Sequence, residues 1–359
     1  MSDFSIGIIG VAGIASAHAK HLKPLAEVSL NACADIKAEA LPPFATKHEI
    51  PSERCFSDYR DMLALPDLDA VSVCTPNKFH CQPTIDALEA GKHVLVEKPM
   101  ARNAAECQRM IDAAKSNDRV LMTGFQWRFS PKAQFLKKQI DGGVTGRILH
   151  ARVHALRRRL VPSWGVFGNL EIQGGGAMID MGVHLLEMAH YLMGSPTPVA
   201  VSGQTFLEIA NRPNDVLCPW GDWDHSTWQT EDLATGYIRF ADSSTMHISS
   251  SFAAHIEEED NEVQLMGTHG GVRFSDATVF TNQHGYMINS KPAYLGKDSD
   301  FAVKMAHFVA CCRDGVPCQA SGEDGLTIQA ILDGLYESAR LGREVRLKHL
   351  TDDELPTIA

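Results

Sequence analysis

Residues 5–15 read SIGIIGVAGIA and place a glycine-containing turn directly after a short apolar run. An apolar run of this length is typical of a strand that is buried on both faces, as in a parallel sheet. A helical pattern follows the turn, and a dinucleotide pyrophosphate can sit on the N-terminus of a helix placed in this way. The stretch therefore predicts the first strand, turn and helix of a nucleotide-binding sheet.

The turn departs from the strict dinucleotide fingerprint at two of its three glycine positions. Gly10 occupies the first position, but Ala12 and Ala15 occupy the second and the third. Alanine is common at the third position, whereas at the second it reduces the clearance for the pyrophosphate, which Gly13 can restore. We expect the cofactor to be bound here by Gly10, Ala12, Gly13 and Ile14.

Short apolar runs alternate with helical segments through the first third of the chain. Further candidate strands lie at residues 28–34, 70–74, 93–96 and 120–123. This alternation is typical of βαβ units and of a doubly wound parallel sheet. We predict an NAD-binding domain of the α/β class over residues 1–124.

The pattern changes after residue 130. Strand-like runs now follow one another without crossover helices, at residues 147–156, 199–206, 232–240, 245–252, 262–266 and 271–274. Together with helical patterns at 177–193, 301–313 and 324–342, they predict an α+β domain with a large, mostly antiparallel sheet over residues 125–359. We expect this domain to bind substrate and to form oligomer contacts, and a C-terminal helix to be free to pack back on the first domain.

The composition limits the classes of partner. The formal net charge of −11 argues against nucleic acid or an anionic membrane, because both reward a basic surface. The nine cysteines have no CxxC spacing and the N-terminus is not signal-like, so we expect a reduced, cytoplasmic protein. No apolar run approaches the ~20 residues of a membrane-spanning helix. A small metabolite is the partner class that fits best.

Lys98 follows the apolar run at residues 93–96 and precedes Pro99. In an open α/β sheet, ligands bind beyond the carboxyl ends of the strands, so we expect Lys98 to project toward a ligand. Taken alone, a lysine that leaves a strand for solvent is an equal alternative.

Asp35 ends the second candidate strand, where an acidic side chain can accept hydrogen bonds from an adenosine ribose. Its charge would repel the 2′-phosphate of NADP, and neither Ile36 nor Lys37 is the arginine that this phosphate prefers. We therefore expect NAD rather than NADP; an Asp that only caps a turn or a helix is the alternative.

The third strand ends just before Thr75 and Asn77, which can border the ribose and the nicotinamide.

A second group of polar residues follows the three glycines at residues 174–176. Asp180 and His184 are four apart on the predicted helix and share one face. They could bind a metal, orient a general base or form a surface ion pair. The glycines would allow a backbone to approach a ligand closely, and a histidine titrates near neutral pH, so we favour the general base. Glu187 could complete a metal-ligand set, but no HExxH or Cys/His spacing supports one, and we expect no metal.

Aromatic and basic residues mark the loops of the second domain. Trp164 and the tryptophans of residues 220–228 could stack on the C–H faces of a sugar, and an interface loop is the alternative. Arg158 lies among three arginines that follow a strand. It could contact substrate, and the alternative is that it lies on a solvated or inter-subunit face. The candidate substrate-binding residues are Lys98, Arg158, Trp164, Asp180 and His184.

These motifs together resemble the Gfo/Idh/MocA oxidoreductases over nearly the whole chain. The matching features are the glycine turn, Thr75-Pro76-Asn77 with His80, Glu97-Lys98-Pro99, Gly174-Gly175-Gly176, Asp180 with His184, and the ending SGEDG, ESA and GREV at residues 321–325, 337–339 and 342–345. The further candidate cofactor-binding residues are Thr75, Asn77, His80, Glu97, Lys98 and Gln126, although His80 also suits the start of a helix.

The resemblance implies a Rossmann domain followed by a domain whose large sheet covers the nicotinamide and often builds a homo-oligomer. It implies NAD(P)-dependent oxidation or reduction of sugars, cyclitols and related polyols. By position, Lys98 and His184 would be the catalytic pair, Asp180 their partner, and Glu97 a neighbour of the nicotinamide ribose. Either Lys98 or His184 could be the base, and a noncatalytic NAD-binding sensor fits poorly because both are present.

Residues 157–176 most resemble family members that act on glucosides and other pyranosides. This resemblance implies a small-molecule sugar or glycoside substrate, oxidised at C3 to a 3-keto product. Inositol oxidation is the near alternative. NAD-dependent glycoside cleavage, in which C3 is oxidised transiently and the cofactor is regenerated, is the alternative from another reaction class.

Overall fold

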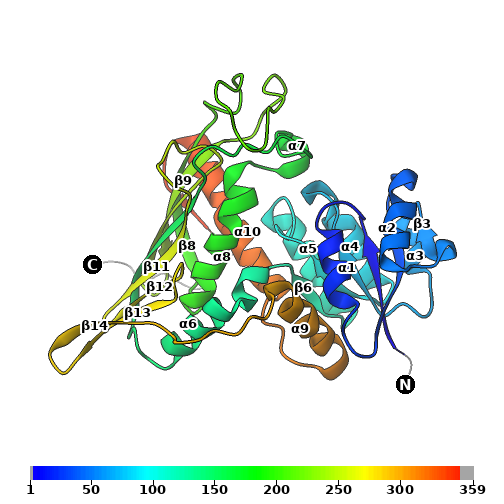
Figure 1. Cartoon of the computed structure of the whole chain (residues 1–359), viewed down its shortest axis with the longest axis horizontal. Helices are drawn as coiled ribbons and strands as arrows, with labels where there is room; N and C mark the ends of the chain where they lie inside the picture. Colours follow the sequence, from blue (N-terminus) through cyan, green and yellow to red (C-terminus); the bar gives the residue numbers. More distant parts are fainter. Residues whose placement is uncertain (1–2, 348–359) are drawn as a thin grey trace. The chain divides into compact units, whose positions relative to one another are not determined.

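The computed structural model describes residues 3–347 of the chain (Figure 1). These residues form two compact units. The first consists of the described residues up to Phe129 together with Asp298–Leu326, and the second of Ser130–Lys297 together with the described residues from Thr327 onward. The segment Asp298–Leu326 thus belongs to the first unit, although it follows the second unit's sheet in the sequence.

The described part of the first unit contains a six-stranded parallel sheet with the strand order β3-β2-β1-β4-β5-β6. The strands are β1 (Phe4–Ile9), β2 (Val28–Ala34), β3 (Cys55–Phe56), β4 (Ala70–Val73), β5 (His93–Val96) and β6 (Leu121–Thr123). The order reverses between β1 and β4, which defines the ligand-binding edge of a doubly wound sheet. The predicted α/β class of this unit is confirmed.

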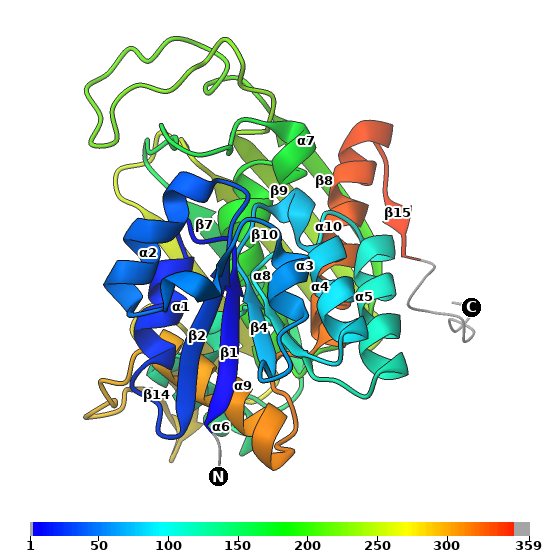
Figure 2. The same cartoon turned by 90° about the vertical axis from the view of Figure 1, so that its right-hand side faces the viewer.

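Helices cover both faces of this sheet (Figure 2). The helices are α1 (Ala15–Leu22), α2 (Leu41–His48), α3 (Tyr59–Leu63), α4 (Cys81–Glu89) and α5 (Ala104–Ser116). Ile8 packs with Ala19 of α1 and Phe44 of α2 on one face, while Val94 packs with Leu88 of α4 on the other. Burial on both faces explains why the strands are apolar throughout.

The C-terminal segment of the first unit is bound to the last strand of the sheet. The segment begins with α9 (Asp300–Asp314), and Thr123 donates its N–H to the Ala320 carbonyl at 2.8 Å. The guanidinium of Arg128 lies 3.3 Å from Asp324 and also donates to the Gln319 carbonyl. Arg128 is only 2% exposed, so these contacts anchor the segment inside the unit.

The described part of the second unit contains a nine-stranded sheet with the order β14-β13-β12-β11-β7-β10-β9-β8-β15. The strands are β7 (Ile148–Leu156), β8 (Pro198–Phe206), β9 (Leu233–Phe240), β10 (Thr245–Ser251), β11 (Asp260–Gly267), β12 (Gly271–Arg273), β13 (Thr278–Gln283), β14 (Tyr286–Ser290) and β15 (Val345–Arg346). Among these strands only β7 and β10 pair in parallel. The predicted mostly antiparallel sheet is confirmed.

Helices pack on one face of this sheet (Figure 1). They are α6 (Pro131–Asp141), α8 (Val183–Leu192) and the part of α10 (Gly322–Leu341) that lies in the second unit. Gly203 and Gly236 on neighbouring strands lie directly under Leu335 of α10, where a Cβ atom would be 2.6–2.7 Å from the leucine side chain. One buried face explains the alternating burial along β9.

The structure differs from the sequence expectations in several places, and the short strands β3 and β15 were not predicted. The edge hairpin of β13 and β14 was not predicted, because every residue of β14 is exposed and the strand has no buried face to create an alternating pattern. The helix expected at residues 177–193 begins as a π-helix over Met178–Gly182 and becomes α-helical at Val183. Among residues 3–347, none of the helices combines the length and the apolar character needed to cross a bilayer.

Candidate active site

The glycine turn after β1 is shaped by backbone crowding. Gly10 has a φ of +85°, and a Cβ atom there would lie 3.0 Å from the backbone of Cys74 and Thr75. Gly13 has a φ of +47° and open space around it, whereas Ala12 has no positive φ and is exposed. The unusual backbone conformations of this turn thus fall on Gly10 and Gly13, and Ala12 needs none.

The turn leads into a helix N-terminus that no side chain caps. Ile14 is the N-cap residue of α1 and makes no side-chain hydrogen bond, and the first turn of α1 contains no acidic residue. The first N–H groups of a helix need partners and attract anions. Together with the open space at Gly13, this N-terminus fits the pyrophosphate of a dinucleotide.

Asp35 lies beside this turn, at the end of β2. One carboxylate oxygen accepts the Val11 N–H at 2.9 Å, and the other accepts the Lys37 N–H at 2.8 Å. The second bond is the turn cap that we considered as the alternative to a ribose contact. Both roles are compatible, because each carboxylate oxygen can accept more than one hydrogen bond and Asp35 is only half-buried.

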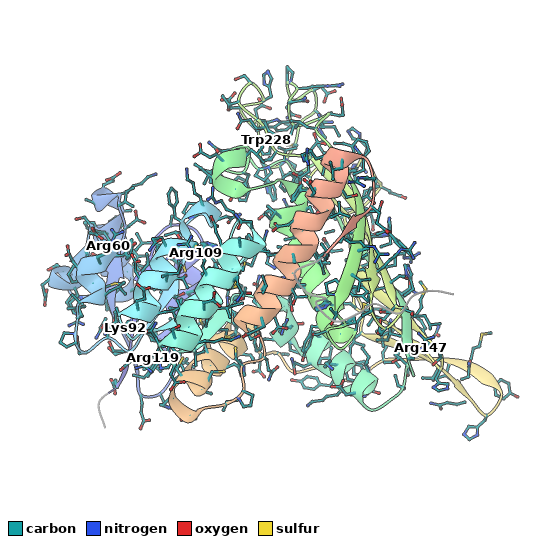
Figure 3. The ribbon with its side chains drawn as sticks, turned by 180° about the vertical axis from the view of Figure 1, so that it is seen from behind. Arg60, Lys92, Arg109, Arg119, Arg147 and Trp228 are labelled. Carbon is teal, nitrogen blue, oxygen red and sulfur yellow. The ribbon has the colours of Figure 1, made fainter. Side chains whose placement is uncertain are left out.

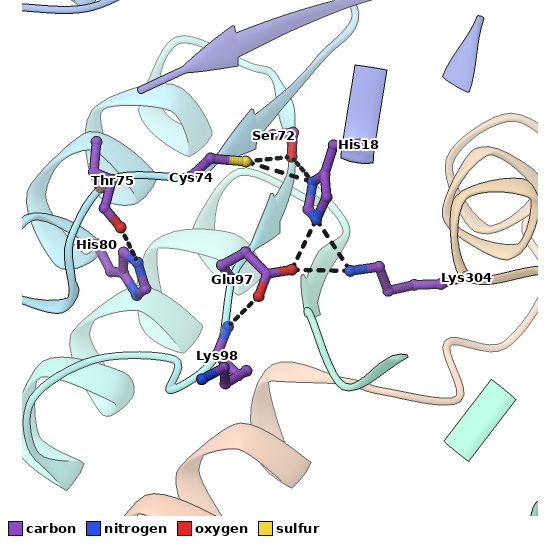
Figure 4. Close-up of polar contacts among 8 residues, drawn as sticks. All are labelled: His18, Ser72, Cys74, Thr75, His80, Glu97, Lys98 and Lys304. Atoms are coloured by element: carbon purple, nitrogen blue, oxygen red, sulfur yellow. Dashed lines mark hydrogen bonds and ion pairs between the residues drawn. The ribbon is translucent and has the colours of Figure 1, made fainter. Parts of the chain in front are cut away.

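Glu97, the residue before Lys98, lies at the centre of a buried polar cluster (Figure 4). Its Oε1 atom is 2.8 Å from His18 Nε2 and 2.9 Å from Lys304 Nζ, and its Oε2 atom accepts the Lys98 N–H at 3.2 Å. Glu97 is 5% exposed and Lys304 is 0% exposed. We expected this carboxylate beside the nicotinamide ribose. Within the first unit it contacts His18 of α1 and Lys304 of α9.

The charges in this cluster follow from burial and from Lys304. Burial opposes ionisation of Glu97, but the Lys304 ammonium and the hydrogen bond with His18 hold the pKa of Glu97 well below its usual value. Burial and the same ammonium lower the pKa of His18 to about 4. At neutral pH the cluster therefore contains an ionised Glu97 and a neutral His18.

Gly124 provides the space for this cluster. A Cβ atom at Gly124 would lie 2.5 Å from Glu97 Oε1, so a larger residue after β6 would displace the carboxylate. Sequence reasoning missed His18 and Lys304, because a histidine on α1 and a lysine on a distant helix carry no local pattern that indicates a shared contact.

His80 supports the loops that carry Thr75 and Lys98 (Figure 4). Its ring nitrogens lie 2.8 Å from the Pro99 carbonyl and 2.7 Å from the Thr75 carbonyl, and it is 1% exposed. It also precedes α4 as the N-cap residue, which is the helix-start position considered from the sequence. Asn77, at the start of the short helix Asn77–Phe79, and Lys98 are both half-buried at this edge of the sheet.

Gln126 follows β6 and is 8% exposed. Its buried Oε1 atom has no hydrogen-bond partner among the described residues. A buried amide oxygen without a partner is costly in free energy, and such atoms often mark the place of a ligand. The position fits a ligand group that donates hydrogen bonds, as the carboxamide of nicotinamide does.

In the second unit, Glu231 organises the glycine segment before Asp180. The carboxylate accepts the Gly176 N–H at 2.6 Å, the Met178 N–H at 3.0 Å and the Tyr336 hydroxyl at 2.9 Å. Burial raises the pKa of Glu231, which is 7% exposed. The carboxylate thus satisfies the N–H groups at the start of the helix that carries Asp180 and His184.

This packing corrects our interpretation of the glycines. A Cβ atom at Gly175 would lie 2.1 Å from the Tyr336 hydroxyl oxygen, and one at Gly176 would lie 1.9 Å from the Glu231 carbonyl oxygen. Gly175 and Gly176 are therefore required by the protein groups packed against them, which explains them without a ligand. Glu231 was missed because a single glutamate before a strand gives no signal of its partners.

Asp180 and His184 are the open positions of an otherwise buried helix. Of residues 175–190, all of which the structure describes, only these two are half-buried and every other residue is buried. Both side chains are therefore partly accessible, which is compatible with the shared face expected from their spacing. Glu187, the third candidate for a metal-ligand set, is 0% exposed.

Of the three arginines at residues 157–159, Arg157 is the one that interacts with the charge of Asp180. Burial lowers the pKa of Arg157, while the nearby carboxylate of Asp180 opposes this shift. The guanidinium also lies over the ring of Trp220, 4.6 Å from its centroid. Arg158, which we expected to contact substrate, is exposed and donates to the Glu257 carbonyl at 2.7 Å.

Trp164 extends the aromatic surface next to Arg157. Its ring centroid is 4.8 Å from that of Trp220 with an angle of 70° between the planes, and Trp164 is 53% exposed. Trp228, which is labelled in Figure 3, is in contrast buried. It packs edge-on against Phe252 and donates its indole N–H to the Thr230 carbonyl at 2.9 Å. Trp164 and Trp220 can thus stack on a ligand, whereas Trp228 supports the loop.

The first unit has a doubly wound sheet with a dinucleotide turn, and the second unit has the partly accessible pair Asp180 and His184. These features are typical of a nicotinamide-dependent oxidoreductase of two units. Family models agree with this class. Residues 4–125 match the model of the oxidoreductase family with an NAD-binding Rossmann fold, and residues 133–273 match the GFO/IDH/MocA C-terminal domain. The chain belongs to the Gfo/Idh/MocA family of oxidoreductases.

Individual relatives indicate the kind of reaction. The chain is 34% identical over 322 residues to the D-glucoside 3-dehydrogenase of Escherichia coli K12, covering 89% of this chain and 91% of that protein. It is 27% identical to the myo-inositol 2-dehydrogenase of Thermotoga maritima, covering 96% and 99%. A structure of levoglucosan dehydrogenase with NADH and levoglucosan superposes with a TM-score of 0.80 at 26% identity, covering 96% and 99%. The protein is an NAD(P)-dependent oxidoreductase that acts on CH–OH groups.

Proposed function

We propose that the protein oxidises the C3 hydroxyl of a pyranoside sugar or glycoside to a 3-keto group with NAD. The observation that carries this proposal is the pair Asp180 and His184, the two accessible positions of a buried helix in the unit that also presents Arg157 and Trp164. The choice of C3 is supported by the glucoside 3-dehydrogenase, the relative with 34% identity.

We propose that the first unit binds NAD. Its pyrophosphate would be held by Gly10, Ala12, Gly13 and Ile14. Asp35 would accept hydrogen bonds from the adenosine ribose and exclude a 2′-phosphate, since no arginine follows it. The nicotinamide end would be bordered by Thr75, Asn77, His80, Glu97, Lys98 and Gln126. Glu97 and His80 would act mainly by fixing the loops, because both are buried.

The residues of the protein must manage the proton of the alcohol. Bound NAD supplies the hydride acceptor, and the protein supplies orientation and acid–base chemistry. In our proposal His184 accepts the hydroxyl proton, Lys98 stabilises the developing alkoxide and Asp180 orients His184. The charge of Arg157 would favour an ionised Asp180 and so support this orientation.

We propose that substrate binds to the second unit. The exposed ring of Trp164 and the neighbouring ring of Trp220 offer an apolar face for the C–H side of a pyranose. The guanidinium of Arg157 supplies hydrogen-bond donors beside them for sugar oxygens. We also propose that the large sheet forms homo-oligomer contacts, since Leu149 and Met266 expose apolar side chains on it, 40% and 39% accessible.

The substrate and the reaction class can be tested together. Purified protein with NAD is screened against methyl glucosides, free hexoses and inositols by the absorbance of NADH, and the product is located by carbon NMR. We expect NADH in proportion to a 3-keto glucoside. Turnover of inositols alone would support the alternative indicated by the inositol dehydrogenase relative, and release of aglycone without net NADH would replace dehydrogenation by glycoside cleavage.

A further inference from the structure

Three potential soft-metal ligands meet in the C-terminal segment of the first unit. The candidate ligand atoms of His307, Cys311 and Cys318 all lie within 4.8 Å of one another, and Cys311 Sγ is 3.3 Å from His307 Nε2. All three residues belong to Asp298–Leu326, on or after α9. None of them belongs to the catalytic or cofactor-binding residues described above.

The local fold brings these residues together. His307 and Cys311 are four apart on α9, so they share one face of the helix. The helix ends at Asp314, and Gly315 has a φ of +68° with its N–H bonded to the Ala310 carbonyl, which reverses the chain. Cys318 therefore returns to the face that carries the other two ligands, just before the segment that is bound to β6.

The three side chains form a typical donor set for zinc. We propose that His307, Cys311 and Cys318 bind a zinc ion through Nε2 and two thiolates, with a water molecule in the fourth position. Two thiolates and one imidazole suit a borderline-soft divalent ion, and they would balance its charge. Zinc bonds of about 2.0–2.3 Å in a tetrahedron place ligand atoms roughly 3.3–3.8 Å apart, so the observed spacing needs only a small contraction.

The hydrogen bonds of His307 support this assignment. Gln319 donates its N–H to His307 Nε2 at 2.9 Å, so this nitrogen is unprotonated and presents the lone pair that a metal requires. Gln319 is exposed, and its N–H can bond to water when zinc takes its place. The ring of Phe129, 5.3 Å from the ring of His307, covers one side of the site.

A zinc ion here would have a structural role. It would join α9 to the returning chain, whose next residues bond to Thr123 and Arg128 at the last strand of the Rossmann sheet. Binding to the folded state alone stabilises that state. We expected no metal from the sequence, since no HExxH or Cys/His spacing supports one.

Metal binding to the full-length protein tests the proposal directly. Protein freed of metal with a chelator is titrated with Zn²⁺ alone and, separately, with Co²⁺ alone. We expect one ion per chain and a thiolate-to-cobalt charge-transfer band, both lost in Cys311→Ser and in Cys318→Ser. The matched control Cys218→Ser, in the second unit, should keep both. Binding without a thiolate band, or equal binding by all variants, would overturn the proposal.

Alkylation of the unaltered protein gives a test that no folding defect can disturb. The metal-free and zinc-treated proteins are labelled with iodoacetamide, and the cysteine-containing peptides are quantified by mass spectrometry. Zinc should reduce the labelling of Cys311 and Cys318 several-fold while Cys218 reacts as before. Equal labelling of Cys311 and Cys318 with and without zinc would contradict the site.

Discussion

Lys304 Nζ lies 2.9 Å from Glu97 Oε1, so that a lysine of α9 is paired with the residue directly before Lys98. Both side chains are buried, and the pair forms within the first unit across more than half of the chain length. The contact links the C-terminal segment to the strand end that carries the proposed catalytic amine.

Replacing Lys304 by Met should destabilise the first unit strongly. Removal of one partner leaves the Glu97 carboxylate buried without its counter-charge, which costs roughly 3–5 kcal/mol. Urea unfolding followed by circular dichroism would measure the change. The double variant Lys304→Met with Glu97→Gln removes both charges and should recover much of the loss. A double variant as unstable as the single one would show that the pairing of charges is not the cause.

The buried His18 should make stability depend on pH. The folded protein holds the pKa of His18 at about 4, whereas a histidine in the unfolded chain titrates near 6.5. The unfolded state therefore binds the proton first, and stability falls as pH decreases from about 6.5 to 4, by on the order of 3 kcal/mol from this group. Glu97 acts in the same direction at lower pH, because its depressed pKa contributes stability that is lost on acidification.

His18→Gln isolates this contribution. Urea unfolding of the variant should show a flatter pH dependence between pH 6.5 and 4 than that of the unaltered protein. His269→Gln, at an exposed histidine of the second unit, should leave the dependence as it is. Identical pH profiles for His18→Gln and the unaltered protein would contradict the assignment.

Glu231 should position the helix that carries Asp180 and His184. Glu231→Ala leaves two N–H groups and the Tyr336 hydroxyl without an acceptor, and each unsatisfied buried group costs about 1–3 kcal/mol. Tyr336→Phe removes only one of these contacts and should cost about 1 kcal/mol. Thermal unfolding measures both effects, with the exposed Glu208→Ala as the control.

Steady-state kinetics separate this positioning role from a purely structural one. If Glu231 fixes the geometry of the catalytic helix, folded Tyr336→Phe should lose more in kcat than in the KM for the sugar. A variant that loses stability but keeps kcat would assign Glu231 and Tyr336 to stability alone.

Local sequence patterns could indicate the candidate site because its parts are local. The turn at Gly10 and Gly13, the strand that leads to Lys98, and the spacing of Asp180 and His184 each depend on neighbouring residues. Patterns of this kind also gave the α/β class and the mostly antiparallel sheet, since burial on two faces or one leaves a different periodicity.

Contacts between distant residues could not be predicted in the same way. Nothing near Lys304 indicates that it meets His18 and Glu97, and nothing near Glu231 indicates that it accepts the Gly176 N–H. Gly175 and Gly176 were misread for this reason: the groups that crowd them are supplied by residues 231 and 336. Such contacts follow from tertiary packing, which a single sequence does not display.

Lys98→Met should remove the amine that stabilises the alkoxide in our proposal. A positioned acid–base or electrostatic group contributes about 10²–10⁴-fold to rate, so kcat should fall by that range. Affinity for NAD, measured by calorimetry, should change little. Lys20→Met, at an exposed lysine of α1, serves as the control. Retained turnover in Lys98→Met would exclude a catalytic role for this residue.

The carboxylate of Asp35 should determine the choice between NAD and NADP. It lies next to the glycine turn through its bond to the Val11 N–H, and the following Ile36 is 87% exposed. In Asp35→Ser with Ile36→Arg, the repulsion is removed and a guanidinium is added where a 2′-phosphate would bind. We expect the ratio of kcat/KM for NADP to that for NAD to rise at least about tenfold, equivalent to ~1.4 kcal/mol. Ile36→Arg alone should shift the ratio less, because the carboxylate still repels the phosphate, and equal shifts in both variants would show that Asp35 does not discriminate.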